Sequence, residues 1–329
     1  MAAALLLLLI PPVGLLAILA FLTRPHAARI PLKGRHVFIT GGSSGIGLAM
    51  ARAAAREGAR VSILARNLAR LEEARAAIQR DSGRDDGVSV GVHAADVRDA
   101  SAVARALEEA GPVDVLVCNH GVFVSQELER QDMDEIRWMV DTNLMGTIHL
   151  VKAALPAMKA RARETRLPGS IAIMSSQAGQ VGIYGYAAYS ASKFALRGLG
   201  EALQHEIIAH NIHVSLIFPP DTETPGLEKE LKSRTELTNI IAGSSGGMKS
   251  DDVAKKALDG IKSAKFIVPC NFEGELLAAA TAGLSPQSSP FMASIEVIGA
   301  GLLRFAALCF QWNWFSTIEK YHAKNKKSE

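Results

Sequence analysis

The sequence predicts an α/β fold in which one parallel β-sheet is covered by helices on both faces, the doubly wound arrangement. Short apolar stretches alternate with Ala- and Leu-rich stretches of helical periodicity between residues 36 and 268. A glycine-rich turn follows the first apolar stretch. Hydrophobic residues make up 48% of the 329 residues, enough for a large core. The two ends of the chain are more continuously apolar, which indicates contact with a membrane.

The expected strands are short apolar runs, typical of a sheet that is buried on both faces. They are His36–Thr40, Arg60–Ala65, Val88–Ala94, Val113–Cys118, Ser170–Met174, Ile212–Ile217 and Phe266–Val268. Helical stretches such as Ile46–Arg56 and Leu68–Gln79 lie between them. Because strand and helix alternate, the strands are expected to run parallel, within one nucleotide-binding domain over residues 35–270.

Charge and cysteine content exclude several kinds of protein. The formal net charge is +3 and no basic run is interleaved with aromatic residues, so no nucleic-acid partner is expected. The three cysteines, Cys118, Cys270 and Cys309, are far apart. Neither a disulfide framework nor a metal site is therefore expected, and the domain is placed in a reducing compartment.

The turn after the first strand has the composition of a phosphate-binding loop. It reads Thr40-Gly41-Gly42-Ser43-Ser44-Gly45-Ile46-Gly47 and opens a helix. Glycines allow the backbone to approach a pyrophosphate, and the helix N-terminus presents free N–H groups to it. The alternative is a purely structural turn, but its position between strand and helix favours a dinucleotide.

Residues after the second and third strands indicate which dinucleotide. Arg66 follows the second strand where an acidic residue would bind the ribose hydroxyls of NAD, and Arg70 lies one helical turn later. Guanidinium groups suit a 2′-phosphate, so NADPH is predicted; the alternative is that both arginines are ordinary solvated residues. Asp96 is a candidate partner of the adenine amino group, or else a helix cap or a turn carboxylate.

A tyrosine and a lysine four residues apart carry the predicted chemistry. Tyr189 and Lys193 share one face of a helix, and Ser175 and Ser176 follow the strand before it. Reduction of a ketone needs a proton at the developing alkoxide, but a phenol has a pKa near 10. A lysine ammonium about 4 Å away supplies roughly 4 kcal/mol, enough to bring that pKa close to neutrality. Ser176 is preferred over Ser175 as the donor to the substrate oxygen.

These motifs, in this order, resemble the classical short-chain dehydrogenases/reductases. The resemblance covers about residues 35–270 and includes Asn119-His120-Gly121 and Asn143. It implies a Rossmann fold, with Asn143 holding a water between Lys193 and solvent. Two departures stand out: His120, to which no catalytic task is assigned, and Pro219-Pro220, where the family commonly has Pro-Gly. The implied nucleotide contacts come from Gly41, Ser43, Ser44, Gly45, Ile46, Gly47, Arg66, Arg70, Asp96, Val97, Asn119, Tyr189, Lys193 and Pro219.

Within that family, residues 175–180, 189–199, 201–204 and 219–222 are similar to the reductases of long-chain keto-bases in sphingolipid synthesis. The resemblance implies a lipid ketone as substrate and a membrane as partner. Residues 221–248 are a candidate lid over the cleft. Two alternatives stay open: a membrane steroid or retinol reductase, and a non-catalytic NADPH-binding scaffold. The sequence does not decide between a monomer and a homo-oligomer.

The ends of the chain are expected to hold the domain at a membrane. Residues 1–24 form the expected anchor, because basic residues follow the apolar run rather than precede it; the alternative is a cleaved signal peptide. Residues 271–315 are expected to be a spanning pair, a re-entrant hairpin or an amphipathic cover over the substrate groove. Residues 316–329 form a charged tail whose Lys326-Lys327 resembles an endoplasmic-reticulum retrieval signal. The catalytic domain is expected to face the cytosol.

Overall fold

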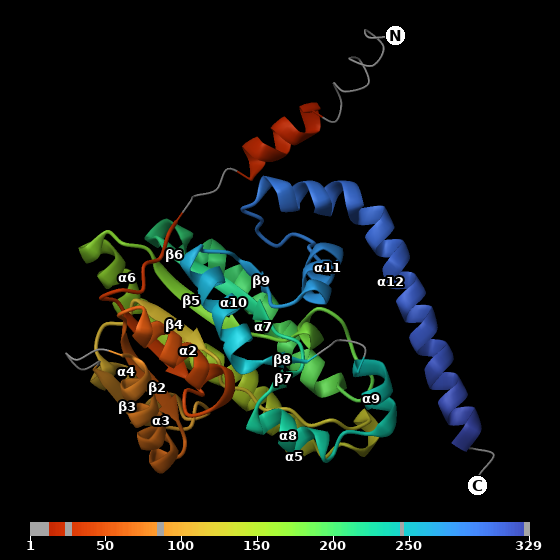
Figure 1. Ribbon diagram of the computed structural model, residues 1–329, viewed down its shortest axis with the longest axis horizontal. Coiled ribbons are helices and arrows are strands. Elements are labelled where there is room, and N and C mark those ends of the chain that lie inside the picture. The colour runs from red at the N-terminus through yellow and green to blue at the C-terminus, as the bar shows by residue number, and fades with distance from the viewer. Residues whose placement is uncertain (1–12, 24–27, 84–88, 244–246, 326–329) are drawn as a thin grey trace.

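The computed structural model describes residues 13–23, 28–83, 89–243 and 247–325. Seven parallel strands form its central sheet in the order β3-β2-β1-β4-β5-β6-β9 (Figure 1). All seven strands expected from the apolar runs are present, with small shifts at their ends, and Val88 lies outside the described residues. Their bounds are β1 His36–Thr40, β2 Arg60–Ala65, β3 Val90–Ala94, β4 Val115–Cys118, β5 Gly169–Met174, β6 Ile212–Phe218 and β9 Ile267–Pro269.

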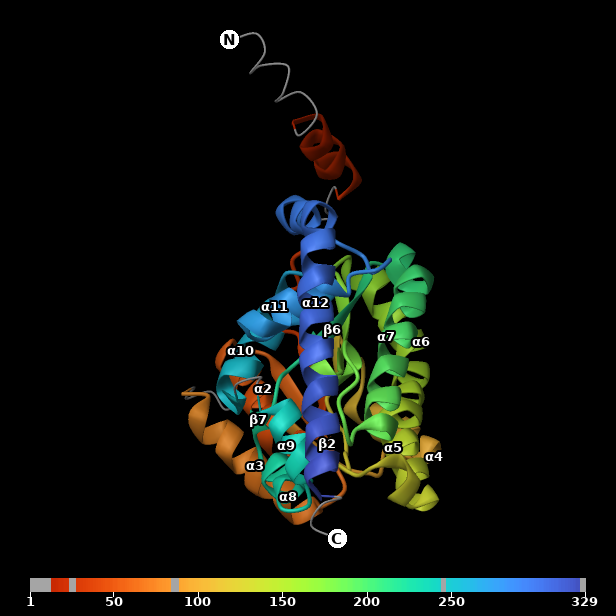
Figure 2. The ribbon, with the colours of Figure 1, turned by 90° about the vertical axis from the view of Figure 1, so that its right-hand side faces the viewer.

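Helices cover both faces of this sheet, as the doubly wound prediction requires. The main ones are α2 Gly45–Arg56, α3 Leu68–Asp81, α4 Ala100–Ala110, α5 Met133–Val140, α6 Gly146–Thr165, α7 Ala187–Ile207 and α10 Ser250–Lys262. One apolar cluster packs α2, α3 and α10 against one face, and a second packs α4, α6 and α7 against the other (Figure 2). Burial of the strand side chains on both faces explains why the strands read as continuous apolar runs.

The strand order reverses between β1 and β4, which pair directly. Chains leaving these two strands diverge toward opposite faces of the sheet, and such a divergence opens a crevice at the carboxyl edge. The glycine-rich turn follows β1 and Asn119 follows β4. The topology therefore brings the predicted phosphate loop to the crevice.

The candidate lid lies between β6 and α10. It contains α8 Pro225–Leu231 and α9 Glu236–Ala242, and a small sheet of β7 Thr222–Glu223 with β8 Met248–Lys249 closes its base. Residues 244–246 of the lid lie outside the described residues. Because β7 and β8 pair, both ends of the segment are fastened together beside the carboxyl end of β6.

The C-terminal region differs from the sequence prediction. Helix α11 (Phe272–Ala280) is much too short to cross a bilayer, which argues against the spanning pair, one of the three alternatives for this region. The re-entrant hairpin and the amphipathic cover stay open. Helix α12 (Pro290–Asn325) is continuous, and the expected boundary at residue 315 does not exist. Its last turns continue the helix because the residues after 315 have no helix breaker until the chain end. Lys326 and Lys327 lie outside the described residues.

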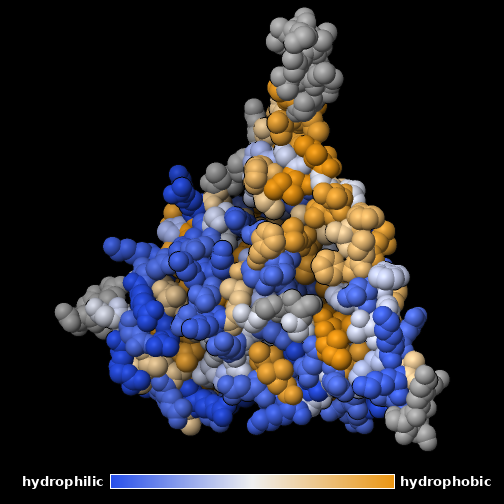
Figure 3. Space-filling model, turned by 45° about the vertical axis from the view of Figure 1, so that its right-hand side comes forward, coloured by the Kyte–Doolittle hydropathy of each residue, from blue (hydrophilic) through white to orange (hydrophobic). Residues whose placement is uncertain are grey.

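Exposed apolar side chains gather at the end of the molecule where the start of α12 and a short helix over Val13–Leu22 lie (Figure 3). Within the described parts of the chain, α12 is the one helix long and apolar enough to cross a membrane, and its apolar window is 6% buried. The first half of the expected anchor, residues 1–12, lies outside the described residues.

Candidate active site

The glycine-rich turn forms a cradle that a dinucleotide fits. Gly41 and Gly45 have φ angles of 64° and 52°, values that residues with a Cβ adopt at a cost. A Cβ on Gly47 would lie 2.3 Å from the Gly41 carbonyl oxygen, so only glycine allows this close turn. Ser44 is the N-cap of α2 and makes no side-chain cap hydrogen bond, which leaves the first N–H groups of the helix available for a phosphate.

Asn119 and His120 fasten the end of β4 to the end of β1. The Asn119 side-chain amide donates to the Thr40 carbonyl oxygen at 3.1 Å, and His120 Nδ1 lies 2.7 Å from the Thr40 hydroxyl. Burial lowers the pKa of His120 to about 3, so the ring is neutral at physiological pH. These contacts give His120 a role in shaping the crevice.

The residues expected at the adenosine end lie beside the carboxyl ends of β2 and β3, with Arg66 and Arg70 exposed and Asp96 half-buried. Arg66 directly follows β2, and Arg70 lies in the first turn of α3, which Asn67 caps by accepting the Arg70 N–H at 3.0 Å. Asp96 pairs with Arg98 at 2.7 Å, and the hydrogen bonds from Arg98 lower its pKa despite partial burial. The helix-cap alternative for Asp96 is wrong, because Asp99 caps α4.

Val97 completes this group of residues, and its side chain is buried. Its carbonyl oxygen lies 3.0 Å from His149 Nδ1, which ties the end of β3 to α6. Pro219 lies at the opposite side, directly after β6, where its carbonyl oxygen accepts the Gln177 N–H at 3.1 Å. It lines the pocket described next.

Tyr189 and Lys193 lie together at the carboxyl edge of the sheet. Both line a cavity of about 280 Å³ that also contains Gly41, Ser44, Gly45, Ile46, Asn119 and both candidate serines. The Lys193 ammonium lies 5.8 Å from the centre of the Tyr189 ring and donates to the Met174 carbonyl oxygen at 3.0 Å. The predicted shared face of the helix is confirmed, and it faces the phosphate loop.

The pKa of the phenol differs from the expectation. Burial raises the pKa of Tyr189 to about 12, with Asp221 and Glu230 adding to the effect, whereas the hydrogen bond with Ser176 opposes it. Burial also lowers the pKa of Lys193 to about 8. In this structure the pKa of the phenol therefore lies above its usual value rather than near neutrality, because burial raises it, while the Lys193 ammonium is directed at a backbone carbonyl.

The two serines have different partners. The Ser175 hydroxyl is buried and donates to the Lys193 carbonyl oxygen at 3.0 Å, which fixes α7 against β5. The Ser176 hydroxyl accepts the Ala178 N–H at 3.1 Å, and its interaction with the Tyr189 phenol acts to lower the pKa of that phenol. This geometry favours Ser176 as the residue that faces the reacting oxygen.

Asn143 lies in a π-helical turn, Asp141–Met145, between α5 and α6. Its side-chain oxygen accepts the Val122 N–H at 2.8 Å, and its amide nitrogen donates to the Val122 carbonyl oxygen and to Ser192. A Cβ on Gly121 would lie within 3.5 Å of both Asn143 Oδ1 and Lys193 Nζ, so Gly121 leaves open the space between them. The water-holding role of Asn143 stays a prediction.

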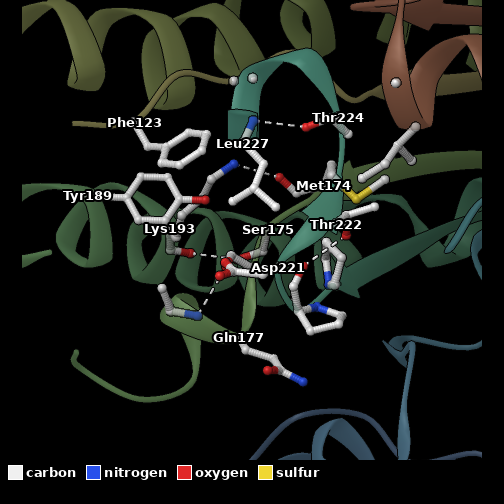
Figure 4. A pocket seen from close by; sticks show the side chains of 18 of the residues that line it. Phe123, Met174, Ser175, Gln177, Tyr189, Lys193, Asp221, Thr222, Thr224 and Leu227 are labelled. Carbon is white, nitrogen blue, oxygen red and sulfur yellow. Dashed lines mark hydrogen bonds between the residues drawn. The ribbon is translucent and has the colours of Figure 1, made fainter. Parts of the chain in front are cut away.

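Several pocket residues were not assigned to the site from the sequence, among them Phe123, Tyr186, Asp221 and Leu227. The rings of Phe123 and Tyr186 lie 5.4 and 5.6 Å from the Tyr189 ring. Figure 4 shows Phe123 beside Tyr189, and Leu227 of α8 lines the same pocket from the lid side. No local motif marks them, since they come from a loop, a helix start and the lid. The other tyrosine hydroxyls are engaged elsewhere: Tyr186 donates to Glu230 at 2.9 Å, and Tyr184 donates to Glu127.

Comparison with known proteins agrees with this geometry. Residues 35–235 match the short chain dehydrogenase family, and the chain belongs to that family. It is therefore an oxidoreductase that acts on a hydroxyl or ketone group. The 3-ketoacyl-(acyl-carrier-protein) reductase from Brucella melitensis, a structure complexed with NADH, has a TM-score of 0.63 and 25% identity, and the match covers 72% of this chain and 97% of that one.

Individual relatives are similar over almost their whole length. A 3-dehydrosphinganine reductase of Arabidopsis thaliana is 57% identical over 96% of this chain and 93% of its own. The 3-ketodihydrosphingosine reductase of Bos taurus is 34% identical over 91% of this chain and 90% of its own. Both matches extend well beyond residue 235, where the family match ends, into the region of α10 to α12.

Proposed function

We propose that this protein is a 3-dehydrosphinganine reductase, which reduces the ketone of a long-chain keto-base with NADPH at the endoplasmic-reticulum membrane. The observation that carries the substrate assignment is the 57% identity over 96% of the chain. The sheet and the Tyr-Lys pair are common to dehydrogenases of many substrates. The similarity continues through the lid and the apolar C-terminal region, beyond the part that the family has in common, and this supports the same substrate.

Arg66 and Arg70 support NADPH rather than NADH. Both guanidinium groups are exposed at the carboxyl end of β2, and neither is held by an ion pair among the described residues. No carboxylate occupies position 66 or 67 to repel a phosphate. Two free cations at this position suit the 2′-phosphate of NADPH.

The proposed reaction uses the site as follows. Bound NADPH supplies a hydride to the carbonyl carbon. Tyr189 gives its phenolic proton to the carbonyl oxygen, and a pKa of about 12 keeps that proton in place at neutral pH until it is needed. The Ser176 hydroxyl donates a second hydrogen bond to the same oxygen as negative charge develops on it. The Lys193 ammonium favours the transient phenolate.

Replacing Tyr189 with phenylalanine tests this assignment. The variant should lose at least about 100-fold in turnover, the usual contribution of a positioned acid, while NADPH fluorescence shows unchanged binding. Tyr184→Phe is the matched control. It removes another phenol of the same segment, and Tyr184, unlike Tyr189, has no lysine four residues later. A Tyr189→Phe enzyme that turns over keto-base at the wild-type rate would refute the role.

A panel of ketones tests the substrate. Wild-type enzyme is given 3-dehydrosphinganine, a steroid ketone and retinal, each with NADPH or NADH, and products are identified by mass. We expect the keto-base with NADPH to be reduced fastest. Faster reduction of the steroid or of retinal than of the keto-base would overturn the substrate assignment. Equal rates with NADH and NADPH would overturn the cofactor assignment.

Membrane attachment is proposed to use the exposed apolar surface of α12. Leu302 and Phe305 are 75% and 65% exposed, and α12 has an apolar stretch long enough to cross a bilayer. The catalytic domain would then face the cytosol. The full chain should co-float with microsomes after alkaline extraction, and Leu302→Glu with Phe305→Glu should release it, since a charged group in lipid costs several kcal/mol. Release of the wild type by alkali would contradict this.

A further inference from the structure

A cluster of buried charges lies directly behind the substrate pocket. Arg234 donates through Nε to both oxygens of Glu230 at 2.9 and 2.8 Å, and through Nη1 to Asp221 Oδ2 at 2.7 Å. The side chains of Arg234 and Glu230 are both 2% exposed. Two carboxylates and one guanidinium leave the cluster with one excess negative charge. Arg234 and Glu230 neutralise each other inside the protein, so the excess charge lies on Asp221, whose 33% exposed side chain a further cation can approach.

The open position in this cluster is on Asp221. Both oxygens of Glu230 are bound by Arg234, and Tyr186 donates to one of them. Among the described residues, the Asp221 carboxylate accepts a side-chain hydrogen bond through Oδ2 alone, and this side chain lines the pocket and is 33% exposed. Of the described residues that line this pocket, Asp221 is the only one with a carboxylate. Its second oxygen is therefore the acceptor available to a cation on the substrate.

The charge on Asp221 also acts on the acid of the reaction. Burial is the largest cause of the raised pKa of Tyr189. The negative charges of Asp221 and Glu230 raise this pKa further, and the positive charge of Arg234 lowers it. Negative charge near a phenol disfavours the phenolate that forms as the proton is transferred. A ligand cation at Asp221 would cancel this effect at the moment when substrate is in place.

We propose that Asp221 is the binding site for the ammonium group of an α-amino ketone, held in position by Arg234 and Glu230. The inference rests on the proposed function, in which the substrate carries an amino group on the carbon next to the ketone. When the carbonyl oxygen meets Tyr189 and Ser176, this amino group lies one carbon away and needs a nearby acceptor. Asp221 supplies it from the segment after β6, across the pocket from Tyr189, and both line the same cavity.

The site predicts selectivity for a free amine. Wild-type enzyme should reduce 3-dehydrosphinganine with a kcat/KM about 10- to 100-fold higher than its N-acetyl derivative or the same chain without nitrogen, as expected for one hydrogen bond to a charged group. Asp221→Asn keeps an oxygen that can accept from Arg234 but removes the charge. This variant should lower the ratio of kcat/KM for the amine to that for the nitrogen-free ketone by a similar factor.

Glu228→Gln is the matched control, since it neutralises an exposed carboxylate in α8 of the same lid and should leave the ratio unchanged. If Asp221→Asn does not fold, the comparison of the three ketones on wild-type enzyme still decides the matter. Equal rates with the amine and the nitrogen-free ketone would overturn the ammonium site while leaving the reductase assignment intact. Failure to reduce any of the three would instead refute the proposed function.

Discussion

The buried charge of Lys193 should destabilise the folded protein at neutral pH. Replacing Lys193 with methionine should remove this pH-dependent cost and should also remove the activity. The lysine is 4% exposed and donates one hydrogen bond, 3.0 Å long, to the Met174 carbonyl oxygen. Burial lowers its pKa from 10.5 to about 8. Since one pKa unit corresponds to about 1.4 kcal/mol, keeping this side chain charged costs about 3 kcal/mol of folding free energy at pH 7. Methionine avoids this cost but leaves the carbonyl unpaired, which costs about 1–3 kcal/mol.

Because these two terms nearly cancel at one pH, the pH dependence is the sharper quantity. The folded-state pKa of Lys193 lies below the unfolded value, so the unfolded chain binds more protons between pH 8 and pH 10.5. The wild type therefore gains stability relative to Lys193→Met as the pH rises through that window. The free energy of unfolding of the variant minus that of the wild type should fall by about 3 kcal/mol between pH 7 and pH 10.5.

Denaturant unfolding of both proteins in one detergent, at several pH values across this window, measures the difference directly. Lys152→Met is the matched control, because Lys152 is an exposed lysine on α6 and its replacement should give a difference that does not change with pH. Turnover of Lys193→Met should fall by about 100- to 10,000-fold, and wild-type turnover should decline above pH 8 as the ammonium loses its proton. A stability difference for Lys193→Met that is flat from pH 7 to pH 10.5 would refute the buried-charge argument.

Three further results are expected. Ser176→Ala should lower kcat by about 10- to 100-fold, because one donor to the developing oxyanion is lost. Ser175→Ala should chiefly lower the free energy of unfolding, by about 1 kcal/mol, measured with denaturant. Equal losses of kcat in the two variants would contradict the roles assigned to the two hydroxyls. Arg66→Ala with Arg70→Ala should raise the KM for NADPH about tenfold or more and leave that for NADH unchanged, since only NADPH carries the 2′-phosphate; a parallel rise in both would count against this role. Gly47→Val should abolish dinucleotide binding in a fluorescence titration, because its side chain collides with the phosphate loop; normal binding would show that the loop adjusts.

The sheet could be predicted because its strands carry their own signal. Strands such as Val37 to Ile39 in β1 and Val214 to Phe218 in β6 are fully buried on both faces, so apolar side chains occupy every position except Ser215 and the run stands out in the sequence. Helix ends carried less information. Helix α12 continues past residue 315 because nothing ends it, although its composition changes there from apolar to charged. The change of composition suggested a boundary that the backbone does not have.

The catalytic group was predictable for a similar reason. The four-residue spacing of Tyr189 and Lys193 already places both side chains on one helix face. The pKa of the phenol could not be predicted from that spacing, because it depends on burial and on charges at Asp221 and Glu230, which lie far along the chain. The direction of the Lys193 ammonium, toward Met174 on β5, is likewise set by tertiary packing.

Glu230 and Arg234 show most clearly where local sequence stops being informative. Four residues apart on the lid, they have the pattern of an ordinary solvated helix pair, worth a few tenths of a kcal/mol. The fold instead buries both and directs the guanidinium at Asp221. Pro220, which stands where the resembling family commonly has glycine, restricts the backbone immediately before Asp221. A carboxylate held by a rigid backbone on one side and by a buried cation on the other loses little entropy on binding a ligand. Pro220 departs from the Pro-Gly pattern and so weakens the resemblance at this loop. The same proline suits the loop to present one fixed negative charge, Asp221, to an amino ketone.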